Sequence, residues 1–152
     1  MKIRRAKPSD AKEISILRRK TIEKVNSKDY PKSVIKFLKR KNSESEILKR
    51  IKERELFVAI EDKKIIGTAD LEGNKIGGVF IRTDRIGKGI GKKLMQFIEN
   101  YAKKKGIKKL KLYPTRTAHD FYIKLGYKVT KKGLWKTKDF RIKNYMMEKR
   151  MK

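Results

Sequence analysis

The stretch Arg85–Leu94, with the sequence RIGKGIGKKL, places three glycines at alternate positions in front of a helical pattern of apolar residues. Gly87, Gly89 and Gly91 lack a Cβ, so the main chain can turn sharply there and leave its N–H groups uncovered. The N-terminus of the following helix adds partial positive charge at the same place. The segment therefore predicts a binding site for a pyrophosphate.

Two common phosphate-binding loops do not fit this segment. A Walker loop requires a G-K-[ST] sequence, which does not follow here. The dinucleotide fingerprint spaces its glycines as GxGxxG, whereas these glycines alternate and come late in the chain. The structural alternative is a glycine-rich turn that only caps a helix.

Composition bounds the fold and excludes several chemistries. The chain has 152 residues, of which 41% are charged and 38% hydrophobic, so we expect one folded domain over residues 1–152. The sequence contains no Cys and a single His. Disulfides, thiolate metal sites and a cysteine nucleophile are excluded, and a histidine metal cage or a Ser-His-Asp triad is hard to assemble. We therefore expect no metal.

Charge and hydropathy bear on location and partners. No apolar run is long enough for a transmembrane helix, and the N-terminus lacks the apolar region of a signal peptide, so we expect a cytoplasmic protein without membrane contact. Lys and Arg number 45 against 17 Asp and Glu, a net charge of +28 that attracts polyanions non-specifically. Because such composition also matches the bias of hyperthermophile proteins, charge alone leaves open whether it serves function or lifestyle.

The rest of the chain alternates between helical and strand patterns. We expect a helix capped by Ser9 or Asp10, a second that begins near Pro31, and a third that begins at Ser43 with a capping box to Glu46. We expect two further helices, one ending at Gly106 and one over Thr117–Leu125. Strands are expected at Lys2–Ala6, Leu56–Ile60, Ile65–Leu71, Lys75–Arg82, Ile107–Tyr113, Tyr127–Thr130 and Asp139–Glu148. This order predicts an α+β or α/β sandwich with a mixed sheet.

Two glycines interrupt the strand that precedes the glycine-rich loop. Gly77 and Gly78 cost stability inside a strand and usually mark a bulge or the close approach of another molecule. We therefore expect this strand to separate from the one that begins at Ile107.

A second informative segment is Thr115–Tyr127, TRTAHDFYIKLGY. On a helix, Ala118, Tyr122 and Leu125 share one face, and His119 lies three residues before Tyr122. These side chains can therefore face one cleft. The alternative is that the aromatic residues and the leucine simply form core.

Together the two segments resemble the GCN5-related N-acetyltransferase (GNAT) superfamily. Val79-Phe80-Ile81 followed by IGKGIGKKLM is similar to its [R/Q]-x-x-G-x-[G/A] motif, and AHDFYIKLGYK is similar to its A-x-x-F-Y-x-K-x-G-[F/Y] segment. The resemblance covers nearly the whole chain in element order. It implies a mixed, mostly antiparallel twisted sheet of about six or seven strands, flanked by about four or five helices, with a splayed V between the two central strands.

The resemblance also implies acetyl-coenzyme A as the co-substrate. The residues that it assigns to the coenzyme are Val79, Phe80, Ile81, Arg85, Ile86, Gly87, Lys88, Gly89, Ile90, Gly91, Lys92, Ala118, Phe121 and Lys124. One departure is Ile86, which stands where the family usually has Arg or Gln. A second is Thr115, where many members carry Asn. The first departure leaves the pyrophosphate to main-chain donors, with Arg85, Lys88 or Lys92 substituting for the missing side chain.

The family transfers the acetyl group directly from thioester to amine in a ternary complex, which agrees with the absence of Cys. A leaving thiolate has a pKa near 8.5 and a phenol one near 10, so Tyr122 is our candidate general acid. The incoming amine must lose a proton to a base. The candidates are Glu72, Asp70, His119 or a water relay, and the sequence leaves the choice among them open.

The acceptor is expected to be a small, peptide or protein amine. By family analogy its contacts include Tyr30, Phe37 and Trp135, and the protein is expected to be a monomer or a homodimer. The alternative function is a basic nucleic-acid-binding protein on an acetyltransferase-like scaffold without catalysis. Against it, aromatics make up only 9%, no RNP, KH or zinc-finger pattern occurs, and Lys is spread evenly.

Overall fold

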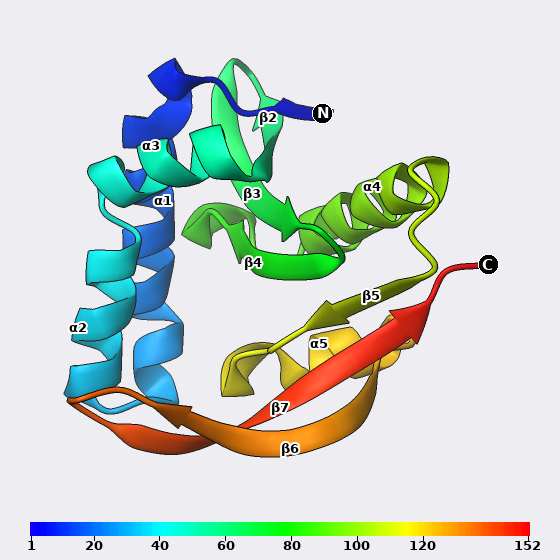
Figure 1. Ribbon diagram of the computed structural model, residues 1–152. Coiled ribbons are helices and arrows are strands. Elements are labelled where there is room, and N and C mark those ends of the chain that lie inside the picture. The colour runs from blue at the N-terminus through cyan, green and yellow to red at the C-terminus, as the bar shows by residue number, and fades with distance from the viewer.

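Seven strands form one sheet in the computed structural model, which describes residues 1–152 (Figure 1). The strands are β1 (Lys2–Arg5), β2 (Glu55–Glu61), β3 (Lys64–Glu72), β4 (Lys75–Ile81), β5 (Lys109–Leu112), β6 (Lys128–Lys136) and β7 (Arg141–Arg150). The helices are α1 (Ala11–Lys24), α2 (Lys32–Lys41), α3 (Glu44–Glu53), α4 (Ile90–Lys104) and α5 (His119–Lys124). The spatial order is β1-β2-β3-β4-β5-β7-β6, and only β4 and β5 pair in parallel. The predicted mixed, mostly antiparallel sheet with five helices is confirmed.

Local signals place the helix ends where the sequence predicts them. Ser43 Oγ accepts a hydrogen bond from the Glu46 N–H at 3.4 Å, which caps α3. Gly106 has a φ of 79°, and the Ile107 N–H donates to the Ala102 carbonyl at 2.9 Å. The left-handed conformation of Gly106 lets this N–H reach a carbonyl that has no partner within the helix, and α4 ends there. None of the helices combines the length and apolar character needed to cross a membrane.

Two predicted segments differ from the structure in extent. The helix expected over Thr117–Leu125 begins as a 3-10 turn at Arg116–Ala118, and the α-helix starts only at His119. Of the two closing strands, β6 is longer than predicted, whereas β7 has the predicted length but lies two residues further along the chain. The two strands form a hairpin that curves below α1 and α2 (Figure 1). Because most β6 side chains are exposed, that strand carries no alternation of apolar and polar residues from which its length can be read.

Helices cover both faces of the sheet because successive strand residues point to opposite sides. Phe57 and Ala59 of β2 pack with α4 residues such as Leu94 in the larger core cluster. Leu56 and Val58 belong instead to a smaller cluster with α1 and α3. Each fully buried side chain of this size contributes about 1.5 to 3 kcal/mol to folding. The alternation in β2 therefore holds both helical layers on the sheet.

A bulge in β4 opens the sheet at its centre. Ala69 pairs with Val79 and Leu71 with Ile76, so Asp70 alone stands opposite Gly77 and Gly78. This extra residue confirms the bulge expected from the paired glycines.

The bulge ends the contact between β4 and β5. The two strands pair only at Lys75 with Lys111 and at Ile76 with Leu112, just before the bulge. The rest of β4, Gly77–Ile81, has no partner strand on that side. The splay expected between these strands is therefore present, and Figure 1 shows β4 and β5 diverging.

Asp70 holds the bulge through a buried network. Its carboxylate accepts the Gly78 N–H at 2.9 Å and lies 3.1 Å from Arg54 Nη1 and 3.4 Å from Arg18 Nη2. Arg18 is also fully buried, and its Nε donates to Thr68 Oγ1 at 2.8 Å. Burial works against the charge of Asp70, but the nearby cations and the Gly78 N–H outweigh it and lower the pKa of this carboxyl. Asp70 therefore stays ionised at neutral pH.

Replacing Gly77 by Ala should lower the free energy of unfolding by about 1 to 3 kcal/mol, the usual cost of overpacking. A Cβ at this position would overlap the Asp70 carboxylate, which cannot move without breaking its ion pairs. Urea unfolding measures the loss. The matched control is Gly133→Ala in β6, where the new Cβ would lie 3.3 Å from the Asn144 side chain only. Equal losses in the two variants would contradict the role of Gly77 in the bulge.

Candidate active site

A cavity of about 360 Å³ lies where β4, the glycine-rich loop, α4 and α5 meet. Its lining residues are Val79, Ile81, Arg85, Ile86, Gly87, Gly89, Ile90, Gly91, Lys92, Ala118, Phe121 and Tyr122. Eleven of the 12 belong to the coenzyme-binding set that the sequence resemblance assigns, and the twelfth, Tyr122, is the candidate general acid. Two motifs about 25 residues apart in the chain thus meet at one hollow, which makes this cavity the candidate active site.

The loop presents main-chain donors to this cavity. Gly87 and Gly89 have φ values of 83° and 79°, in the left-handed region that favours glycine. The first hydrogen bond of α4 runs from the Lys93 N–H to the Gly89 carbonyl at 3.1 Å. The N–H groups of residues 90–92 therefore have no partner within the helix. Together with the helix dipole they form a site suited to a phosphate group.

Few cationic side chains reach the cavity. Arg85 lines it, but its Nη2 lies 3.1 Å from Glu61 Oε1, so that guanidinium is engaged with a carboxylate of β2. Lys92 lines the cavity from the first turn of α4, whereas Lys88 and Lys124 do not line it. Among the side chains proposed to replace the family's Arg or Gln, Lys92 is the best placed for an anion.

The unpaired part of β4 forms one wall. The Arg82 N–H donates to the Ile66 carbonyl at 2.8 Å, which sets the ladder between β4 and β3. Because main-chain groups alternate in an antiparallel ladder, those of Val79 and Ile81 point away from β3, toward the splay. Thr21 Oγ1 donates to the Ile81 carbonyl at 2.9 Å and satisfies it from α1. The main-chain groups of Val79 stay available to a ligand that enters the splay.

Phe80 is placed differently from its neighbours. Its ring packs on the opposite side of β4, where the Arg18 guanidinium carbon lies 4.8 Å from the ring centroid. The strand alternation that turns Val79 and Ile81 toward the cavity turns this side chain away from it. Only main-chain atoms of Phe80 remain near the proposed coenzyme path.

Tyr122 lies in the cavity wall as a buried phenol. Its ring stands edge-on to those of Phe121 and Tyr127, with centroids 5.0 and 5.9 Å apart. Burial raises the pKa of Tyr122 far above the ordinary value of a phenol, and the negative charge of Asp70 raises it further. The group therefore keeps its proton at neutral pH and can serve only as a donor to a developing negative charge.

The candidate bases are not gathered at this cavity. Glu72 lies at the end of β3 with its side chain 53% exposed, 3.4 Å from Arg54 Nε. His119 packs its ring against Tyr145 and has Nδ1 3.7 Å from Asp120 Oδ1. Neither lines the cavity.

Asp70, the third candidate base, lies close enough to influence Tyr122 but is a weak proton acceptor. Its carboxylate already accepts the Gly78 N–H and forms ion pairs with Arg18 and Arg54. These partners stabilise the ionised form and lower the pKa of the carboxyl.

Four aromatic residues form a cluster between α2 and the β6–β7 hairpin. The Trp135 ring lies 5.7 Å from Phe37 and 6.4 Å from Tyr30, and Phe140 joins at 4.8 Å. Phe140 was not predicted, because it follows the turn after β6 and no local pattern connects it to α2. The cluster anchors the tip of the hairpin to the N-terminal helices.

Arg18 and Thr21 are the positions that the sequence reasoning missed. With Ile14 they stand at i, i+4 and i+7 along α1, on the face that packs against the sheet. The sequence did hold a signal for Arg18, because it is a cation on an otherwise apolar helix face and a buried charge needs a partner.

Comparison with known proteins gives the same architecture. A family model described as an acetyltransferase (GNAT) domain matches residues 22–149. A GCN5-related N-acetyltransferase from Rhodopseudomonas palustris superposes with a TM-score of 0.91 at 21% identity, over 98% of this chain and 94% of the other. The PaiA N-acetyltransferase from Thermoplasma acidophilum, solved with coenzyme A, gives 0.80 at 23%, over 98% of both chains. No curated protein sequence matches the chain.

A third solved structure extends the likeness to an enzyme with a protein acceptor. The ribosomal-protein-S18-alanine N-acetyltransferase from Escherichia coli gives a TM-score of 0.72 at 15% identity, over 99% of this chain and 93% of the other. At these identities the three structures share the fold with this chain.

Tyr122 should show no ionisation up to about pH 11, because its raised pKa keeps the proton where an ordinary phenol near 10 loses it. Carbon NMR of ring-labelled tyrosine measures this, with the Tyr122 signal assigned by its loss in Tyr122→Phe. Circular dichroism at each pH checks that the protein stays folded. A titration midpoint near 10 would contradict the burial of the hydroxyl.

Proposed function

The chain belongs to the acetyltransferase (GNAT) family, and from this membership we propose that it is an N-acetyltransferase that uses acetyl-coenzyme A and a primary amine. The observation that carries the proposal is the meeting of three features in one cavity: the amide-lined loop, the unpaired edge of β4 and the protonated Tyr122. Each suits a different part of the coenzyme.

The loop suits the pyrophosphate. Gly87 and Gly89 have open space where a side chain would be, so a phosphate can approach the main chain closely. The free N–H groups at the start of α4 and the Lys92 side chain supply donors and positive charge. The residues present therefore fit the group, even with Ile86, 48% exposed, in place of the usual side chain.

The splay suits the pantetheine arm, which carries amide groups. The outward main-chain groups of Val79 can pair with such an amide as a missing strand would. Phe121 of α5 and Ala118, at the end of the preceding 3-10 turn, form the facing wall. An arm laid along β4 leads from the loop toward Tyr122.

Acetyl-coenzyme A supplies an activated thioester, from which the amine takes the acetyl group as a C–N bond forms and the C–S bond breaks. Tyr122 Oη–H donates a hydrogen bond to the departing sulfur and stabilises the negative charge that develops there. Because a thiol, with an ordinary pKa of about 8.5, is a stronger acid than the phenol, the sulfur can leave as thiolate and take its proton from water afterwards. The proton of the attacking amine is released to water, since neither Glu72 nor His119 lines the cavity. The main chain of β4 and the ring of Phe121 orient the reacting group.

Changing Gly89 to Asp should abolish coenzyme A binding, with an affinity loss of more than about a hundredfold. The substitution strains a φ of 79° and sets a negative charge where the pyrophosphate would lie. Calorimetry measures the affinity. Gly106→Asp is the matched control, because Gly106 has the same φ and equally open surroundings at the other end of α4. Unchanged affinity in Gly89→Asp would remove the loop from the site.

Changing Tyr122 to Phe should lower kcat about a hundredfold while the affinity for acetyl-coenzyme A stays nearly constant, because only the hydroxyl is lost. Release of free thiol, measured against a panel of amino acids, polyamines and peptides, gives the rate. Tyr127→Phe is the control, since that hydroxyl donates to Glu99 at 2.9 Å, away from the cavity. Wild-type turnover in Tyr122→Phe would reject the acid role.

A further inference from the structure

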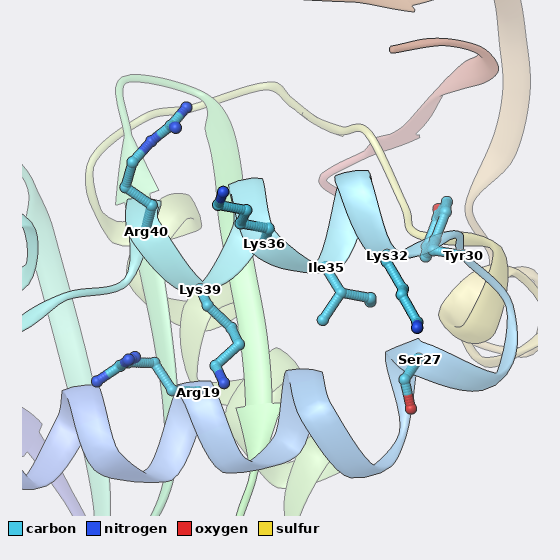
Figure 2. Close-up of a pocket in the computed structure, with 8 residues that line it drawn as sticks. All are labelled: Arg19, Ser27, Tyr30, Lys32, Ile35, Lys36, Lys39 and Arg40. Carbon is cyan, nitrogen blue, oxygen red and sulfur yellow. The ribbon is translucent and has the colours of Figure 1, made fainter. Parts of the chain in front are cut away.

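A second, larger cavity of about 730 Å³ lies in the groove between α1 and α2 (Figure 2). Its lining residues are Arg19, Ser27, Tyr30, Lys32, Ile35, Lys36, Lys39 and Arg40. None of them lines the candidate active site. We call this cavity the α1–α2 groove.

The groove is strongly cationic. Five of its eight lining residues are Lys or Arg, and none is acidic. The one nearby carboxylate that engages a groove cation is Glu23, whose Oε2 lies 3.5 Å from Lys39 Nζ and whose side chain is 66% exposed. Figure 2 shows Lys32 and Lys39 reaching from α2 into the space above α1, with Ile35 between them, whereas the side chains of Lys36 and Arg40 extend from the other side of α2. A multivalent anion between the helices would meet Lys32, Lys39 and Arg19 at once.

The spacing of these cations is unfavourable without such a ligand. Lys32 and Lys36, and again Lys36 and Arg40, stand four residues apart on the same helix. Like charges at this spacing repel and weaken a helix. Arg19 adds a further positive charge from α1. An anion bound in the groove would offset this repulsion, so its binding would stabilise α2.

The shape and floor favour a peptide over a nucleic acid. From Lys32 to Arg40 the groove runs about 12 Å along α2, which matches about four residues of extended chain. Its apolar lining is the Ile35 side chain and the Tyr30 ring. Tyr30 is only 9% exposed, and its ring packs against Trp135 and the Arg116 guanidinium, so little of it is accessible for a base to stack on.

One end of the groove is joined to the wall of the active site. The Arg116 N–H donates to Tyr30 Oη at 2.8 Å, and Thr117 Oγ1 donates to Asp29 Oδ2 at 2.6 Å. Both donors belong to the 3-10 turn that ends at Ala118, which lines the cavity with Tyr122. A chain held along α2 therefore has its Tyr30 end beside this wall.

From these observations we propose that the α1–α2 groove binds an acidic segment of a peptide or protein whose amine is acetylated. The inference rests on the proposed function, since it names the class of acceptor for the same site. The acidic residues are held by the cations of α2 and Arg19, and the amine lies beyond Tyr30.

The test compares two peptides that each carry a free α-amine and a lysine, followed by four glutamates in one and four glutamines in the other. We expect the glutamate peptide to bind more tightly by calorimetry and to be acetylated with a kcat/KM about tenfold higher. In Lys32→Glu/Lys36→Glu this preference should fall to about one, while coenzyme A affinity is unchanged. Both lysines are exposed and without an acidic partner, so the fold should tolerate the change.

The matched control is Lys49→Glu/Lys52→Glu on α3, which makes the same change in net charge at two exposed lysines outside the groove. It should keep the preference for the glutamate peptide. If both double variants lose the preference equally, the overall charge of the protein explains it and the groove proposal is overturned. The groove proposal is also overturned if Lys32→Glu/Lys36→Glu keeps the preference.

Two further outcomes separate this inference from the proposed function. Acetylation of amines with no preference for acidic peptides would overturn the groove proposal and leave the enzyme proposal standing. Binding of the glutamate peptide in the groove without acetyl transfer to any amine would overturn the enzyme proposal and leave the groove as a site for acidic peptides. A single-stranded RNA oligomer that competes with the peptide and loses more affinity than the peptide in the groove variant would assign the groove to nucleic acid instead.

Discussion

The hydrogen bond from the Gly78 N–H to the Asp70 carboxylate is the contact on which the candidate site depends. It replaces a ladder bond between β3 and β4, so the extra residue of the bulge is held in place by a side chain. The carboxylate is buried, and it is tolerable there because Arg18 and Arg54 lie beside it. The same group thus ties α1 and α3 to the centre of the sheet.

Two properties of the cavity follow from this arrangement. The bulge ends the pairing of β4 with β5 after Ile76, so the main chain of Val79 faces an open splay. The fixed negative charge of Asp70 also helps to raise the pKa of Tyr122, which keeps that phenol protonated. One buried carboxylate thereby shapes the wall and adds to the effect of burial in raising the pKa of the candidate acid, while its own ion pairs make it a poor base.

Local patterns in the sequence were enough to predict the loop, the bulge and the helix ends. Paired glycines, a glycine after a helix and a Ser-x-x-Glu box act over a few residues, so their effects can be read without tertiary contacts. The two short motifs, taken together with the strand before the first, also predicted which residues line the cavity. Local rules and tertiary structure agree at these positions.

Local patterns could not predict the contacts between segments that lie far apart in the sequence. The pairing of Arg18 with Asp70 joins residues 52 apart, and Arg85, a predicted phosphate ligand that lines the cavity, also forms an ion pair with Glu61. Phe80 was assigned to the coenzyme together with Val79 and Ile81, and the alternation of the strand turns its side chain to the other face of the sheet. The length of β6 was missed because an exposed edge strand rich in lysine has no apolar period.

The positive charge of the protein can act in two ways, by attracting polyanions non-specifically and by binding an anion at a defined site. A net charge of +28 draws any polyanion toward the protein, but beyond about 8 Å salt screens exposed charges at physiological ionic strength. The coenzyme cavity makes little use of that charge, because its donors are mainly main-chain N–H groups and neither Lys88 nor Lys124 lines it. The cations that are arranged together in a hollow are those of the α1–α2 groove, where they share no lining residue with the coenzyme cavity. Selection for coenzyme binding alone therefore does not account for their placement, whereas an acidic acceptor does.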